Sequence, residues 1–278
     1  MGNLQTDTPL QLYFLHITSE KPDRLADFYE GQMGLQKSKD GDSWVMRGGA
    51  RSAVISLGPS ASLLYPAYAV DSQQSLVKLK ERLRANGVEL EPLSSPLYRE
   101  GAFLVVDPQG RKIAFGEKIS TQIQDAMPAR LQHTVFQTTE LETVVKFYTD
   151  AIGFSVSDEV VNEEGKTMVV FLRSDDEHHS LAFFRGSKNE WDHHCYETNE
   201  WNDIRDWGDS FAKLRIPIFF GPGRHGPGNN LFFMVTDPDG NRLEFSAELQ
   251  RVSPEVAPGI WEHGEYTLNS WGSAWIRT

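Results

Sequence analysis

The chain repeats two short patterns in the same order, and this repetition limits its fold more than any other feature. Phe28-Tyr29 is followed by Gly34, five residues after the tyrosine, and Phe147-Tyr148 is followed in the same way by Gly153. Each copy predicts a helix of about three turns that ends at a glycine just past its last turn. The two copies lie 119 residues apart.

The second repeated pattern is Asp-Pro-x-Gly, at residues 107–110 and 237–240, each time between two apolar runs. Both copies predict two strands joined by a tight turn with proline at its second position. They lie 130 residues apart, so the two patterns together predict a duplicated domain of about 120 residues. We expect a non-catalytic domain at 1–122, a metal-binding catalytic domain at 123–252, and a tail at 253–278 that forms a lid, a subunit contact or simple surface packing.

Within each half, the apolar periodicity runs through strand, helix and several strands, and then does so again. The second helix of each half is predicted at residues 72–86 and 201–214, before Gly87 and Pro217. Each half therefore contains two βαβββ modules. The sequence predicts an α+β fold of two tandem domains and four modules.

Composition limits the environment and the partners of the chain. Apolar residues make up 39% and charged residues 24%, which is typical of a globular protein. The formal net charge of −12 and the lack of an 18-residue apolar run argue against nucleic-acid and membrane partners. A single cysteine, Cys195, leaves no internal disulfide or CxxC motif, so we expect a cytoplasmic protein.

The two halves differ at positions that could bind a metal. Subtracting the offset of 119 from His133 gives Phe14, and subtracting 130 from Glu244 gives Ala114. A third candidate ligand is His194, in a segment that starts the fourth module as residues 131–133 start the third. Two imidazoles and a carboxylate with open coordination positions are typical of non-haem Fe(II) oxygenases. Zn²⁺ can use the same ligands, so ligand type alone leaves the metal open.

The most specific motif of the second half consists of Gly223-Arg224-His225, Phe233, Asp237-Pro238-Asp239-Gly240 and Glu244. With this motif, the chain resembles the type I extradiol ring-cleaving dioxygenases of the vicinal oxygen chelate superfamily over nearly its whole length. The resemblance implies Fe(II), less often Mn(II), with O2 as co-substrate and a catechol-type aromatic substrate. It also implies a homo-oligomer and assigns the metal to His133, His194 and Glu244.

The resemblance extends to two further histidines. His179 precedes His194 by 15 residues, and His225 precedes Glu244 by 19, as the catalytic histidines of the family do. It implies that His179 is an acid–base and electrostatic partner where O2 binds, and that His225 hydrogen-bonds a substrate oxygen. Neighbouring side chains on a strand point to opposite faces, so we interpret His178 and His193 as structural.

One position departs from the family pattern. The family has tyrosine three residues before the aspartate of the Asp-Pro turn, where it contacts the bound phenolate, and this chain has Met234. A thioether cannot donate a proton. Either Tyr266, Tyr196 or His263 makes that contact at the substrate site, or the substrate does not require it.

Two alternatives use the same scaffold. One is a Zn²⁺- or Ni²⁺-dependent isomerase or lyase of glyoxalase type, which has no need for both His179 and His225. The other is a protein that binds an aromatic compound without metal and without turnover. In that case, His133, His194 and Glu244 would have come together by chance.

Overall fold

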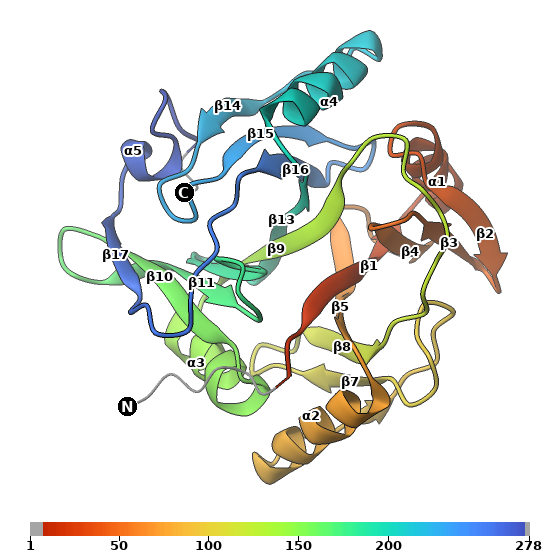
Figure 1. The fold of residues 1–278 in the computed structure, drawn as a ribbon, viewed down its shortest axis with the longest axis horizontal. Helices are drawn as coiled ribbons and strands as arrows, with labels where there is room; N and C mark the ends of the chain where they lie inside the picture. The colour runs from red at the N-terminus through yellow and green to blue at the C-terminus, as the bar shows by residue number, and fades with distance from the viewer. Residues whose placement is uncertain (1–7, 276–278) are drawn as a thin grey trace.

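The structure, a computed structural model, describes residues 8–275. It contains four consecutive units, each made of one strand, one helix and three further strands (Figure 1). The first two units form one sheet and the last two form another. The predicted α+β fold of four βαβββ modules is therefore confirmed.

The first sheet has eight strands in the order β2-β3-β4-β1-β5-β8-β7-β6. Its strands and the two helices packed on it are β1 (Gln11–Ser19), α1 (Pro22–Gly31), β2 (Gln36–Asp40), β3 (Ser43–Arg47), β4 (Ser52–Leu57), β5 (Ser62–Val70), α2 (Gln73–Ala85), β6 (Glu91–Pro92), β7 (Phe103–Val106) and β8 (Lys112–Glu117). The predicted helix at 72–86 is α2, with Ser72 and Asn86 as its caps.

The second sheet has nine strands in the order β14-β15-β16-β13-β9-β12-β11-β10-β17. Its elements are β9 (Arg130–Thr138), α3 (Leu141–Lys146), the π-helical turn η1 (Phe147–Ile152), β10 (Ser155–Val161), β11 (Thr167–Arg173), β12 (Leu181–Arg185), β13 (Glu190–Glu197), α4 (Trp201–Lys213), β14 (Phe220–Arg224), β15 (Leu231–Thr236), β16 (Arg242–Ala247), β17 (Gly259–Glu262) and α5 (Glu265–Leu268). The tail thus adds β17 to the edge of this sheet, parallel to β10. The domain limits at 122 and 252 remain predictions.

The repeated patterns have the local structures that the sequence predicts. Tyr29 and Tyr148 are buried under their helices, and Gly153 ends η1 in the left-handed conformation, with φ 104°. In the second Asp-Pro-x-Gly turn, the Oδ1 atom of Asp237 accepts the backbone N–H groups of Asp239 and Asn241. The aspartate therefore fixes the turn that places β15 beside β16.

The helices lie outside and the strands inside. Figure 1 shows α1 to α4 along the rim of the molecule, with β1 and β9 side by side near its centre. Alternate residues of each strand pack against the helices, as Phe233 and Phe245 do, while their neighbours point to the concave face. No helix in the described part of the chain is long and apolar enough to cross a membrane.

The strand registers of the two halves correspond. On the first sheet Phe14 pairs with Ala67, and Ala67 pairs with Ala114. On the second sheet the matching chain of pairs is His133, Cys195 and Glu244. The predicted correspondence of His133 with Phe14 and of Glu244 with Ala114 is therefore confirmed.

The concave face of the first half is filled with apolar and aromatic side chains. Phe14 and Ala114 are fully buried in a cluster with Tyr65 and Tyr98. The second half carries polar groups and a pocket at the equivalent place, so the candidate site residues lie in one copy of the duplicated fold.

Candidate metal centre and pocket

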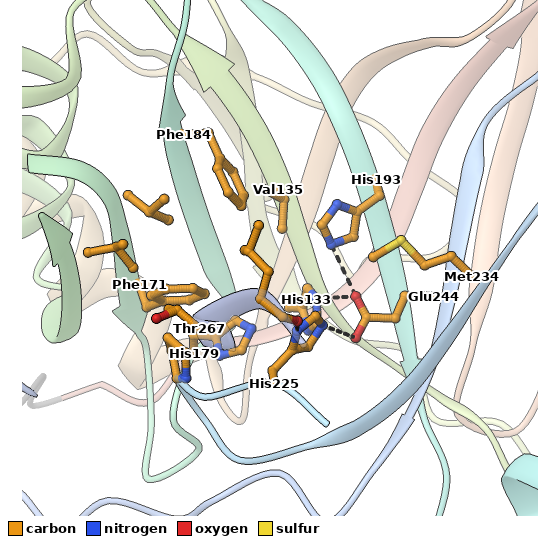
Figure 2. A pocket seen from close by; sticks show the side chains of 14 residues that line it. His133, Val135, Phe171, His179, Phe184, His193, His225, Met234, Glu244 and Thr267 are labelled. Atoms are coloured by element: carbon orange, nitrogen blue, oxygen red, sulfur yellow. Dashed lines mark hydrogen bonds and ion pairs between the residues drawn. The ribbon is translucent and has the colours of Figure 1, made fainter. Parts of the chain in front are cut away.

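A buried carboxylate lies at the centre of the second sheet. Glu244 on β16 is 1% exposed, and its Oε2 atom lies 3.5 Å from the Nε2 atom of His133. The same oxygen lies 3.2 Å from the Nε2 atom of His193 (Figure 2). β16, β13 and β9 are neighbours in the sheet, and the three side chains share its concave face.

The outer nitrogens of both imidazoles are held by acceptors. The Nδ1 atom of His133 lies 2.5 Å from Oε1 of Gln132, and the Nδ1 atom of His193 lies 2.5 Å from Oδ1 of Asp192. Since these oxygens accept hydrogen bonds, each ring donates its Nδ1–H and, when neutral, turns the Nε2 lone pair toward Glu244. Two lone pairs that converge on a carboxylate repel it unless a proton or a metal ion lies between them. The donor set therefore fits a divalent metal with its outer hydrogen-bond partners in place.

The pKa shifts agree with a carboxylate that stays ionised. Burial alone raises the pKa of Glu244, but contacts with His133, His193 and His225 outweigh burial and hold that pKa well below its usual value. Burial lowers the pKa of His133, which favours the neutral, ligating form of its ring. Burial acts the same way on His193, but Asp192 and Glu244 raise its pKa above the usual value.

His194 lies outside this cluster, contrary to the expectation from the sequence. Its side chain is on the other face of β13, with Nε2 3.3 Å from the hydroxyl oxygen of Tyr29 and its ring stacked on Trp191. Burial lowers the pKa of His194 to about 3, so this ring is neutral in the core. The placement of His194 beside His133 and Glu244 is wrong because neighbouring strand residues alternate, and His193 takes its place.

The sequence contains a signal for the histidine that faces Glu244. Tyr68 and Tyr196 are both buried on the helix side of equivalent strands, β5 and β13. When these two tyrosines are aligned, His193 takes the position that Tyr65 of the apolar cluster has in the first half. Each histidine that faces Glu244 directly follows a polar residue: His133 follows Gln132, and His193 follows Asp192. This shared pattern gives the same register.

Cys195 lies close to the same atoms. His133, Cys195 and Glu244 each offer a ligand atom within 4.8 Å of the other two. However, the thiol donates to Ser246 Oγ at 3.2 Å, and burial raises its pKa well above the usual value. Because a thiol binds metal only after losing its proton, the imidazole of His193 is the better third ligand.

His179 and His225 lie beside the cluster, as the sequence predicted. The ring centroid of His179 is 4.5 Å from that of His133, and burial lowers the pKa of His179 well below its usual value. The Nε2 atom of His225 lies 3.6 Å from Glu244 Oε1, while its Nδ1 donates to the carbonyl of Leu268 at 2.6 Å. Both rings line the pocket, and their catalytic roles remain predictions.

Asn230 is a site residue that the sequence analysis missed. It is fully buried, and its Nδ2 donates to Glu244 Oε1 at 3.2 Å, on the side away from His133 and His193. This hydrogen bond orients the carboxylate. Asn230 belongs to the segment rich in Gly, Pro and Asn that also carries His225, and its position there gives no sequence signal for this contact.

The pocket next to the cluster has mostly apolar walls and a volume of about 490 Å³ including its open mouth. Figure 2 shows Phe171 and Phe184 on one side and Met234 next to Glu244 on the other. The aliphatic and aromatic side chains of the strands that line it are Val135, Val160, Val169, Phe171, Phe184 and Met234. Met234 is 1% exposed, so its position at the pocket agrees with the sequence analysis.

The residues of the tail that line the pocket differ from those that the sequence predicted. Thr267 and Leu268 of α5 line it, whereas Tyr266 is 73% exposed and His263 is exposed as well. Tyr196 packs among the helix-facing residues. The placement of Tyr266, His263 or Tyr196 at the substrate site is therefore wrong, and no tyrosine lines the pocket in the described part of the chain.

Comparison with known proteins identifies the second half. Residues 130–245 match the model of the Glyoxalase/Bleomycin resistance protein/Dioxygenase superfamily. These residues form a domain of that superfamily. The match contains His133, His193 and Glu244, so all three candidate ligands belong to the superfamily domain.

Relatives of the chain carry the names of metapyrocatechases and of catechol and extradiol dioxygenases. Metapyrocatechase 2 of Cupriavidus necator is 29% identical over 191 residues, which are 66% of this chain and 56% of that protein. The 3-methylcatechol 2,3-dioxygenase of Pseudomonas putida is 26% identical over 220 residues, 72% of this chain and 75% of that protein. The chain thus spans little more than half of the first relative. The predicted resemblance to extradiol dioxygenases is confirmed by these homologues.

Solved structures share the fold of the superfamily domain and of the preceding half. Homoprotocatechuate 2,3-dioxygenase from Brevibacterium fuscum, in complex with 3,4-dihydroxyphenylacetate, superposes with a TM-score of 0.83 at 22% identity, covering 98% of this chain and 92% of that one. The Mn(II)-bound glyoxalase from Novosphingobium aromaticivorans gives 0.83 at 23% identity, covering 95% and 91%. At these identities the likeness concerns the fold.

Proposed function

We propose that this chain is a metal-dependent extradiol dioxygenase that opens a catechol ring next to its two hydroxyl carbons. The observation that carries the proposal is the geometry at Glu244, where two imidazole nitrogens from neighbouring strands face one carboxylate oxygen at 3.2 and 3.5 Å. This group lies at the wall of a pocket whose lining is mostly apolar. The dioxygenase relatives support the reaction class.

His133, His193 and Glu244 would hold the metal, with Fe(II) as our first choice and Mn(II) as the alternative. Two histidines and one carboxylate leave open positions for further ligands. A metal ion held there would supply the redox chemistry between the catechol and O2. Gln132, Asp192 and Asn230 orient the three ligands through the contacts described above.

His179 would act as the proton acceptor of the reaction. Its Nδ1 atom lies 3.0 Å from Nδ1 of His178, so Nε2 is left for the pocket. A neutral imidazole with a free Nε2 can accept a hydroxyl proton from the substrate and return it to the product. The lowered pKa of His179 keeps the ring neutral before the substrate binds.

His225 would orient the substrate. Its Nδ1–H is fixed on the carbonyl of Leu268, and its ring lies flat on Phe232 with centroids 3.8 Å apart. Nε2 is therefore an acceptor held at the pocket by packing on one side and a hydrogen bond on the other. A substrate hydroxyl can donate to it, which would fix the ring relative to Glu244.

The pocket walls favour an uncharged catechol. No Lys or Arg lines the pocket in the part of the chain that the structure describes, and its non-histidine walls are mainly aliphatic and aromatic. A substrate carboxylate would lose its hydration there without gaining a partner. We expect alkyl- or aryl-substituted catechols to react faster than acids such as 3,4-dihydroxyphenylacetate.

Oxygen uptake by the anaerobically purified, Fe(II)-loaded protein tests this function. We expect one O2 consumed per catechol and a yellow ring-opened product, with a higher kcat/KM for 3-methylcatechol than for 3,4-dihydroxyphenylacetate. The same experiment with Mn(II) separates the two metals. A protein that retains iron but consumes no O2 with any catechol would refute the proposal, and retention of the intact catechol would favour a binding protein.

A further inference from the structure

A second histidine and a carboxylate lie next to His179. The Nδ1 atoms of His178 and His179 are 3.0 Å apart, and the His178 ring presents Nε2 to Asp158 Oδ2, also at 3.0 Å. His178 is 1% exposed and Asp158 is 8% exposed. The three side chains therefore form a buried row that runs from the pocket to β10.

The contacts within this row limit which nitrogen of each imidazole ring can carry a proton. Because both ends of the His178–His179 contact are Nδ1 atoms, one must donate and the other must accept. Asp158 can only accept while ionised, and its Oδ2 favours a proton on Nε2 of His178. Oδ2 lies off the line of that N–H bond, so the attraction is electrostatic as much as a hydrogen bond.

We infer that Asp158 and His178 are positioning residues that hold His179 in the tautomer with a proton on Nδ1 and a lone pair on Nε2 toward the substrate. With the proton on Nε2 of His178, 3.0 Å from the carboxylate of Asp158, a neutral His178 has only a lone pair at Nδ1. His179 must then donate its own Nδ1–H, which leaves its Nε2 unprotonated. Only the expected effect of this tautomer on turnover rests on the proposed function; the tautomer itself does not.

Asp158 is itself held in place by the tail. Its Oδ1 accepts the backbone N–H of Gly259 at 2.9 Å, and its Oδ2 accepts Nε1–H of Trp261 at 2.6 Å. Burial raises the pKa of Asp158, but the contacts with His178, Trp261 and Gly259 outweigh burial and lower it. The strand β17 thus helps to keep the carboxylate of Asp158 ionised at the end of the row. Through Asp158 and His178, the tail therefore contributes to the tautomer of His179.

Nitrogen NMR of histidine side chains tests the inference without any turnover. In the ¹⁵N-histidine-labelled, Zn(II)-loaded full chain, we expect the shifts of His179 to show a protonated Nδ1 and an unprotonated Nε2. Substitution His178→Phe removes the acceptor, and the ratio of the two tautomers of His179 should change about tenfold toward Nε2–H, the effect of one lost hydrogen bond. Substitution His178→Asn places an amide oxygen near the lost Nδ1 and should restore the original tautomer.

The matched control is His263→Phe, which removes an exposed histidine of the tail and should leave the His179 signals unchanged. In the Fe(II)-loaded enzyme, His178→Phe should lower kcat, by at most tenfold, at unchanged KM and unchanged iron content, because a smaller fraction of the rings carries the required lone pair. His178→Asn should regain most of this loss.

The inference would be overturned if His179 carried its proton on Nε2 in the unsubstituted chain. It would also be overturned if the His179 signals did not change on substitution His178→Phe. These outcomes are independent of the proposed function, since the NMR experiment needs no substrate. A chain that shows the expected tautomers but takes up no O2 would instead refute the function alone.

Discussion

His193 and His194 are neighbouring buried histidines, and they point to opposite faces of β13. His193 faces Glu244, and His194 contacts Tyr29. We predict that His193→Ala removes metal binding and that His194→Ala does not. Structural zinc sites with four ligands bind with about 10–16 kcal/mol, or about 3 kcal/mol per ligand, which is more than 100-fold in affinity. His193→Ala should lose about this much because Nε2 lies 3.2 Å from Glu244 Oε2.

His194→Ala should instead lower stability. Its ring stacks on Trp191 and contacts the hydroxyl of Tyr29 at 3.3 Å, so its removal leaves a small cavity and a buried hydroxyl. We expect a loss of about 1–3 kcal/mol in the free energy of unfolding. Competition of Fe(II) with a chelator measures the first effect, and thermal unfolding of the metal-free chain measures the second. Loss of metal in His194→Ala with full binding in His193→Ala would show that β13 has the opposite register.

Three further predictions concern the surroundings of the site. Asp192→Asn should weaken metal binding about 10- to 100-fold in the same competition assay, because His193 Nδ1 loses a charged acceptor; equal affinity would contradict the role of Asp192. Burial, only partly offset by hydrogen bonds from Ser246 and the Leu249 N–H, raises the pKa of Glu197 to about 7, from 4.5. Since the folded state holds this proton more tightly, the stability is complete below pH 4.5 and is lost as the pH rises through 7. Glu197→Gln should remove about 3 kcal/mol of this pH dependence in urea unfolding of the metal-free chain, and an unchanged pH profile would argue against it. Leu268→Ala keeps the carbonyl that binds His225 but widens the pocket, so kcat/KM for 2,3-dihydroxybiphenyl relative to catechol should rise about tenfold; an unchanged ratio would place the substituent elsewhere.

The fold could be predicted because its signals are local and occur twice. The Phe-Tyr pattern and the Asp-Pro-x-Gly turn each fix a helix end or a hairpin through contacts within a few residues, as Asp237 does with Asn241. The order of these elements then leaves the module as the repeating unit. His133 and Glu244 could also be found, because Phe14 and Ala114 occupy the same register positions in the other half.

Other parts of the site could not be found so directly. A shift of one residue on a strand exchanges its two faces, and the pair His193-His194 offers the same side chain to both. The tail has no copy in the first half, so nothing in the sequence shows that Thr267 and Leu268, rather than Tyr266, turn toward the pocket. The contact of Asn230 with Glu244 likewise depends on how a loop returns to the sheet.

The comparison of the two halves explains why only one of them can hold a metal. In the first half, the positions of His133, His193 and Glu244 are taken by Phe14, Tyr65 and Ala114. Phe14 packs against Tyr98, with ring centroids 5.1 Å apart, so aromatic rings fill the space that is open in the second half.

A buried carboxylate at Ala114 would therefore have neither imidazoles to face nor room for a substrate. In the second half, His133, His193, His225 and Asn230 surround the carboxylate of Glu244. The residues that would hold the metal thus also offset the cost of burying the charge of Glu244, which the apolar and aromatic side chains of the first half could not do.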